Sequence, residues 1–265
     1  MIRFFRNIRQ KLAAENNVSK YLRYAIGEII LVVIGILIAL QINNWNENRK
    51  ERLIEIKYLK NLKHNLQNDS MDLVEYKNIR IGISNAAHEL LKYAKLQNFD
   101  NVYRLDSLYI TVVLWVQFIH NNNTFEELRS SGNLQLIKND SIKNLLLDLN
   151  QKYEELVSDR DHMRREYDNY LYDQRVGQIS FLDVSNPDEI NTILDWFYPH
   201  SQSVAENKIK LQSHFRKLLS NTTFINGLAL AAGNNLWIVE ADYKIMLDDI
   251  NKLIKLIDQD LKTVD

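Results

Sequence analysis

The chain has 265 residues, with 33 lysines and arginines against 34 aspartates and glutamates, and a net charge of −1. Seven glycines, two prolines and 46% hydrophobic residues favour an all-α protein, because a sandwich or barrel needs many more turn residues. The sequence contains no cysteine, which excludes disulfides, thiolate metal sites and cysteine nucleophiles.

The charges are distributed unevenly along the chain. Residues 1–45 hold six basic and two acidic residues, whereas the remainder holds 27 basic and 32 acidic residues. A mildly acidic body without a basic stripe argues against a nucleic-acid partner. The six basic residues are Arg3, Arg6, Arg9, Lys11, Lys20 and Arg23. By the positive-inside rule we expect them to hold residues 1–23 in the cytoplasm. Apolar residues at helical spacing among them also fit an amphipathic helix in the membrane interface.

Residues 24–42, YAIGEIILVVIGILIALQI, are predicted to form a transmembrane helix. At 1.5 Å per residue they reach roughly 28 Å, about the thickness of a hydrocarbon core. Tyr24 and Trp45 are expected to mark the two interfaces. A buried helix of a soluble protein is one alternative, and a signal peptide cleaved near Ala39 is another. We favour an uncleaved anchor, because about 23 residues precede the apolar run and the helical pattern resumes at Trp45.

One face of this span combines a charge with small residues. Gly35 and Ala39 follow Glu28 by 7 and 11 residues, which places all three on one side of a helix. Small residues four apart let two helices approach closely, and a polar group beside them can bond across the interface. We therefore predict that Glu28, Gly35 and Ala39 form a face for self-association or for a partner. The alternative is that Glu28 lies among the cytoplasmic headgroups without such a role.

Two stretches resemble a known family. Residues 27–51, GEIILVVIGILIALQINNWNENRKE, are preceded by FFRNIRQKL and KYLRYA, and residues 124–140 read TFEELRSSGNLQLIKND. Together they are similar to an uncharacterised family of short-tailed, single-span membrane proteins of Gram-negative bacteria. The first stretch is long and specific, and the second is more degenerate. The resemblance implies an inner-membrane anchor and a helical periplasmic domain, and it implies no activity and no catalytic residues.

Beyond the span, apolar residues at spacings of three and four from Leu53 to Ala94 predict a long bundle helix. The pattern has a gap at Asp69, and a break capped by residues 68–70 is the alternative. A turn is predicted at 98–101. The apolar run 108–119 is interpreted as a buried helix, although its β-branched residues also allow a strand.

Further helices are predicted in the second half of the chain. Thr124 and Glu127 form a capping-box pattern for a short helix that ends before Gly132, and Asn139 caps a long helix. The inner face of the long helix is predicted to carry Ile142, Leu145, Leu149, Tyr153, Leu156, Met163, Tyr167 and Tyr170.

Three more helices are predicted over residues 188–197, 203–219 and 222–262. Gly227 and Gly233 would permit tight packing near the start of the last one. The sequence thus predicts a cytoplasmic tail (1–23), one transmembrane helix (24–42) that continues into long helices, and an extracytoplasmic antiparallel helical bundle (43–265).

The sequence contains no recognisable catalytic or metal-binding motif. Its six histidines lack the HExxH and paired Glu-x-x-His patterns, and phosphate-binding glycine loops and GxSxG are absent. Tyr167, Tyr170 and Tyr172 fit either a cleft between helices or, more commonly, a bundle core. The corner 124–139 is interpreted as structural, with peptide binding as the alternative. We predict no catalytic residue, no cofactor and no metal site.

These observations predict a non-enzymatic, membrane-anchored interaction or scaffold protein of the periplasm. Its expected partners are the lipid bilayer and either a second copy or another envelope protein. The alternative function is a ligand-sensing ectodomain. The stretch before the span is too short for a transmitter domain, so such a sensor would signal through a membrane partner.

Overall fold

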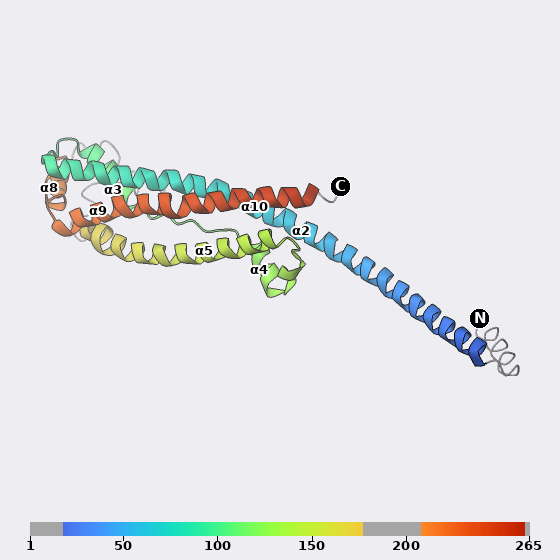
Figure 1. The fold of residues 1–265 in the computed structure, drawn as a ribbon. Coiled ribbons are helices and arrows are strands. Elements are labelled where there is room, and N and C mark those ends of the chain that lie inside the picture. Colours follow the sequence, from blue (N-terminus) through green and yellow to red (C-terminus); the bar gives the residue numbers. More distant parts are fainter. Residues whose placement is uncertain (1–17, 177–207, 263–265) are drawn as a thin grey trace, which may run out of the picture. The chain divides into compact units, whose positions relative to one another are not determined.

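The computed structural model describes residues 18–176 and 208–262, where all regular secondary structure is helical, as predicted. The chain divides into two units, Met1–Lys57 and Tyr58–Asp265, and we call the second the body. The predicted helix 188–197 lies outside the described residues. In chain order the elements are α2 (Val18–Leu96), α3 (Val102–Val113), α4 (Asn123–Ser130), the 3₁₀ turn η1 (Asn133–Leu136), α5 (Asp140–Tyr167), the π-helical turn η2 (Asp168–Tyr172), α6 (Asp173–Val176), α8 (Lys208–Leu218), α9 (Thr222–Trp237), the π-helical turn η6 (Ile238–Tyr243) and α10 (Lys244–Lys262) (Figure 1).

Helix α2 is uninterrupted over 79 residues, so there is no break at 68–70. Asp69, which seemed a gap in the apolar pattern, is buried and bonded to distant parts of the body. Its Oδ1 accepts a hydrogen bond from the backbone N–H of Asn121 (2.7 Å), and its Oδ2 accepts one from the Tyr153 hydroxyl (3.1 Å). Burial raises the pKa of the Asp69 carboxyl, against the opposing effect of these two hydrogen bonds.

The long helices of the body lie side by side. In Figure 1, α5 runs in the same direction as the body part of α2, and the helical stretch α9–η6–α10 runs antiparallel to both. Ion pairs join these neighbours: Lys63 on α2 pairs with Asp258 on α10 (2.6 Å), and Lys152 on α5 pairs with Asp249. The predicted antiparallel bundle is confirmed.

The body buries its apolar side chains in two clusters. Fully buried representatives are Leu59, Leu73, Ile142 and Ile250 in the first cluster and Leu90, Leu105, Phe215 and Phe224 in the second. Along α2 the position between the two clusters is held by Arg80, and along α9 it is held by Asn235; both side chains are buried. The core is therefore divided by a layer of polar groups.

The predicted helix over 108–119 is correct only up to Val113, because residues 114–122 are not helical. Two side chains of α2 bond to backbone groups that a helix would have satisfied internally. Arg80 Nη2 donates to the carbonyl of Val116 (3.3 Å), and Asp69 accepts from the N–H of Asn121. The open backbone also lets Phe118 enter the core, where its ring packs between those of Tyr153 and Tyr243.

The predicted capping box of Thr124 and Glu127 is wrong. Helix α4 begins at Asn123, and its N-cap is Asn122, whose side chain makes no capping hydrogen bond. Thr124 Oγ1 instead accepts from Asn65 (3.0 Å), and Glu127 accepts from the Tyr58 hydroxyl (2.9 Å), so both residues fasten the corner to α2. Gly132 does adopt the predicted left-handed conformation (φ 73°), as a C′ residue does.

The start of α5 and the turn after α2 follow the prediction. The side chain of Asn139 accepts from the backbone N–H groups of Ser141 and Ile142, and that of Asn101 caps α3 in the same manner. On the inner face of α5, Leu146 is buried where Leu145 was expected. Tyr170 is exposed rather than inward, because the π-helical turn η2 changes the register after residue 167.

The tight packing expected at two glycines occurs at one of them. A Cβ at Gly227 would lie 2.7 Å from Tyr170 Cβ and 2.9 Å from its carbonyl oxygen, whereas a Cβ at Gly233 would meet nothing within 4 Å. Both glycines belong to α9. The α9 backbone therefore approaches η2 as closely as it does only because residue 227 has no side chain.

These two glycines make a matched pair of substitutions. Gly227→Ala should lower the free energy of unfolding by about 1–3 kcal/mol, because the new methyl group meets atoms fixed by the backbone. Gly233→Ala should raise it by about 0.5–1 kcal/mol, since alanine is the better helix former and has space here. Thermal unfolding of the full chain in detergent measures both changes. Equal effects of the two substitutions would contradict this packing.

Candidate functional site

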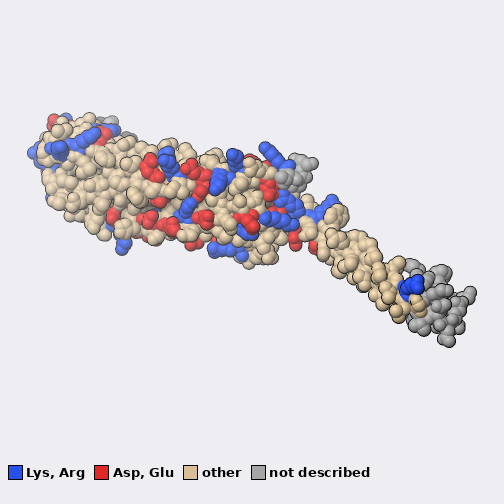
Figure 2. Space-filling model, in the orientation of Figure 1, with Lys and Arg blue, Asp and Glu red and all other residues tan. Residues whose placement is uncertain are grey.

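The apolar stretch of α2 is the first candidate for function. Every side chain from Ile29 to Lys50 is exposed. Within this part of the chain, an 18-residue window has a mean hydropathy of 2.6 and no buried residue. Within the described ranges, α2 is the one helix long and apolar enough to cross a membrane. Residues 29–46 contain no charged side chain, whereas both signs of charge are interspersed over the face of the body that Figure 2 shows. An apolar surface of this extent is unfavourable in water and suits a membrane anchor.

The predicted association face lies within this stretch. The spacing of Glu28, Gly35 and Ala39 places them within about 40° of one another around the helix. Glu28 is half-buried and Ala39 is exposed. A Cβ at Gly35 would meet no atom within 4 Å, so this part of the face is open. Its use by a partner stays a prediction.

The residues predicted to set orientation are described only in part. Arg23 is exposed and donates to the hydroxyl of Ser19 (3.1 Å), and Trp45 is 64% exposed. Lys20 and Tyr24 belong to α2. The remaining four, Arg3, Arg6, Arg9 and Lys11, lie outside the described residues.

The second candidate is the polar layer of the body, which centres on Arg80. Its side chain is 3% exposed and donates to three neutral acceptors. Nε donates to the Tyr243 hydroxyl and Nη1 to Oδ1 of Asn235, both at 2.9 Å, and Nη2 donates to the carbonyl of Val116. One turn further along α2, Ser84 donates to the carbonyl of Ala232 (2.8 Å). Four backbone and side-chain acceptors from three segments thus converge on α2.

No carboxylate in the described part of the chain lies within ion-pairing distance of Arg80. The charge of Arg80 acts on the pKa of one acidic residue, Asp242. Burial raises the pKa of Asp242, the nearby acidic groups on α5 raise it further, and Arg80 acts in the opposite direction. Arg80 is therefore a buried cation held by neutral hydrogen-bond acceptors. Desolvation of such a group costs several kcal/mol, which its hydrogen bonds must offset.

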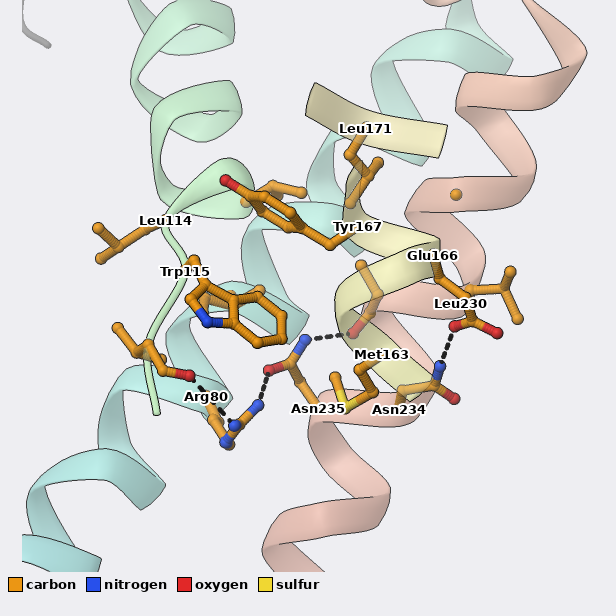
Figure 3. Close-up of a pocket in the computed structure, with 15 residues that line it drawn as sticks. Arg80, Leu114, Trp115, Met163, Glu166, Tyr167, Leu171, Leu230, Asn234 and Asn235 are labelled. Carbon is orange, nitrogen blue, oxygen red and sulfur yellow. Dashed lines mark hydrogen bonds between the residues drawn. The ribbon is translucent and has the colours of Figure 1, made fainter. Parts of the chain in front are cut away.

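A cleft opens beside this layer, between α2, α5, α9 and the segment after α3 (Figure 3). One wall is aromatic: the rings of Trp115 and Tyr167 lie 5.3 Å apart, and the guanidinium of Arg164 lies over Trp115 at 5.0 Å. The opposite wall is polar, with Asn234 donating to Glu166 (2.7 Å). Met163, Leu171 and Leu230 supply the aliphatic part of the lining.

Two of the helices that line the cleft, α5 and α9, are each followed by a π-helical turn. Glu166 and Tyr167 precede η2, and Asn234 and Asn235 precede η6. Single π-helical turns inside α-helices occur frequently at functional sites. Partial burial raises the pKa of the Tyr167 hydroxyl to about 12, so this group is a neutral donor at physiological pH. The cleft thus combines a fixed cation, neutral polar groups and an aromatic wall.

Of the tyrosines considered as cleft residues, Tyr167 does line the cleft. Tyr170 and Tyr172 are exposed, although the Tyr172 ring stacks near that of Tyr167 (6.1 Å). Arg80 was not predicted, because the neighbouring apolar residue Ile79 also lies at a spacing of three and four from Tyr76 and Ile83. Spacings that alternate strictly between three and four residues lead from Tyr76 through Arg80 to Ile83, and this pattern could have identified Arg80 as an inward-facing position.

No three His, Cys, Asp or Glu side chains within the described ranges are placed to hold a metal ion together. The described structure defines a class, that of an all-helical protein in which a helix with an unburied apolar stretch leads into a helical body. The chain belongs to a family of unknown function, DUF6090, whose model matches residues 28–195. No curated protein and no solved structure matches the chain significantly. The matched region includes Arg80, Trp115 and Glu166, and it ends before α9.

Proposed function

We propose that the chain is a single-pass protein of the bacterial inner membrane, with residues 1–23 in the cytoplasm and the chain from residue 43 in the periplasm. The observation that carries the proposal is the stretch of α2 whose apolar side chains are all exposed. Six basic residues precede this stretch against two acidic ones up to residue 45, a bias that orients single spans. Trp45, exposed at the end of the stretch, suits the interface.

Within this placement we assign the body a non-enzymatic interaction or scaffold role in the cell envelope. The body exposes large apolar side chains, including Trp237 at the end of α9 (68% exposed) and Ile245 near the start of α10 (48% exposed). Aromatic side chains of this kind dominate the binding energy of protein interfaces. The open face at Gly35 supplies a second contact surface within the span.

Orientation is tested with reporter fusions. A reporter that is active only outside the cytoplasm, fused after Asp265, should be active in intact cells, because positive-inside orientation exports the body. The same reporter inserted after Lys20 of the full chain is the control and should be inactive. Activity after Lys20 combined with inactivity after Asp265 would overturn the orientation.

The association face is tested by crosslinking, which the absence of native cysteine simplifies. Ala39→Cys should crosslink in the membrane to a second copy or to another protein, whereas Val33→Cys, about 120° away around the helix, should crosslink far less. Adding Gly35→Leu to the Ala39→Cys chain should reduce the product several-fold by keeping the helices apart. Gel mobility and mass spectrometry identify the product.

Glu28→Leu in the same background separates the polar contribution from the packing contribution. A loss of product comparable to that of Gly35→Leu is expected if the carboxyl group bonds across the interface. Ile34→Leu is the volume-conserving control and should leave the product unchanged. Equal crosslinking at Ala39→Cys and Val33→Cys would contradict the face and reduce the span to a tether.

A second candidate function, ligand sensing by the periplasmic body, is favoured by one specific observation. The cleft beside Arg80 joins a buried cation to an aromatic wall. A sensor of this kind would pass its signal to a membrane partner through the span. A ligand can shift such a protein from one conformational state to another only if it binds the two states with different affinities.

A further inference from the structure

We propose that the cleft beside Arg80 binds a small molecule with one carboxylate on an apolar body. The inference deepens the ligand-sensing candidate and rests on it for its purpose in the cell. It does not depend on the orientation of the span or on the association face. Its test measures binding alone, so a negative result would leave the fusion and crosslinking results intact.

The two buried arginines of the body, Arg175 and Arg80, differ in their hydrogen-bond partners. Arg175 is buried and forms an ion pair with Asp106 (2.6 Å), as expected for a guanidinium removed from water. Arg80 is more deeply buried, at 3% exposure against 6%, yet its acceptors are a phenol, an amide and a backbone carbonyl. No carboxylate of the described residues is paired directly with Arg80, and Asp242 interacts with it only through its charge. A carboxylate in the cleft would supply a directly bonded anion.

The guanidinium of Arg80 can form stronger hydrogen bonds to a carboxylate than to its neutral acceptors. The guanidinium fork matches a carboxylate with two parallel N–H donors, and such charge-assisted pairs are about twice as strong as bonds to neutral acceptors. Of the three bonds that Arg80 makes, the one to the carbonyl of Val116 is the longest, at 3.3 Å. The buried side chain of Asn235 is held at both ends, because its Nδ2 also donates to the carbonyl of Ala231 (2.8 Å). The guanidinium has five N–H groups and three make these bonds, so a carboxylate can accept from the second N–H of each Nη, with the long bond to Val116 giving way, while Nε keeps its bond to Tyr243.

The walls of the cleft indicate what the rest of the ligand should be. Trp115 and Tyr167 face the cleft, and Arg164 over the indole ring helps to fix it. Together with the aliphatic side chains of the lining they suit a short hydrocarbon body. Glu166 is negatively charged on the polar wall and is held by Asn234. It disfavours a second carboxylate on the ligand, which makes the preferred class monocarboxylates.

The volume of the cleft limits the size of the ligand, and its rim limits entry. The free volume of the cleft is about 30 Å³, which has room for two or three water molecules. A ligand of this class must therefore be small, and entry requires a side chain at the rim to move. Leu230 meets this need, because it lines the cleft and is 36% exposed. Its replacement by a larger residue offers a way to close the cleft without changing Arg80.

The experiment uses the full chain in detergent micelles and four probes: acetate and propionate, and their neutral amides. Each amide has the shape of its acid without the charge. The two acids should raise the Tm by about 3 °C or more at roughly ten times their Kd, and the amides should bind at least tenfold more weakly. Titration calorimetry measures each Kd directly.

Three variants locate the site. Arg80→Lys keeps the charge and loses the fork, so the acids should bind on the order of tenfold more weakly. Leu230→Trp fills the exposed rim and should abolish binding while the Tm without ligand stays the same. Arg104→Lys is the control, because Arg104 lies on the surface in an ion pair with Glu89, and it should bind the acids as the parent chain does.

The two outcomes are clearly separated. Binding of an acid, rejection of its amide and loss of binding in Leu230→Trp support the site, even if Arg80→Lys fails to fold. The proposal is overturned if neither acid binds, if acids and amides bind equally, or if Leu230→Trp binds as tightly as the parent chain.

Discussion

The body of the protein depends on two charged side chains that occupy the apolar seam of a single helix. Within the body, the seam of α2 runs at strict intervals of three and four residues from Leu59 to Ala94, and Asp69 and Arg80 occupy two of its positions. Both are buried and both bond to the non-helical segment 114–122, Asp69 through a backbone N–H and Arg80 through a backbone carbonyl. A buried charge is costly unless it is bonded, so these two residues admit few arrangements of the segment that covers them.

The functional features follow from this arrangement. Since residues 114–122 are not helical, Trp115 can face Tyr167 across the cleft. The two core clusters are separated by the polar layer. The π-helical turns η2 and η6 adjust the registers of α5 and α9 on the other side. The apolar stretch of α2 is subject to a different constraint, because no residue in the described ranges covers it. One helix thus carries a lipid-compatible surface in one unit and buried polar contacts in the other.

Local signals in the sequence predicted much of the helical fold. The turn at 98–101, the cap at Asn139, the left-handed Gly132 and the apolar stretch of α2 each depend on neighbouring residues alone, and the structure has them. The failures involve residues that serve distant partners. Thr124 and Glu127 look like a capping box but bond to α2, and Asp69 looks like a helix break but bonds to Asn121. Arg80 was missed for the same reason, since nothing within one helix reveals that its acceptors lie on three other segments.

The central claim, that charged residues of α2 fix the segment 114–122, is tested most directly by hydrogen exchange at the amide of Asn121. This amide lies outside any helix and donates to the buried carboxyl of Asp69. The account predicts that it exchanges slowly in the full chain, with protection comparable to helical amides of α5, and that Asp69→Ala removes this protection. Exchange of the Asn121 amide at the rate of an open loop in the parent chain would contradict the account.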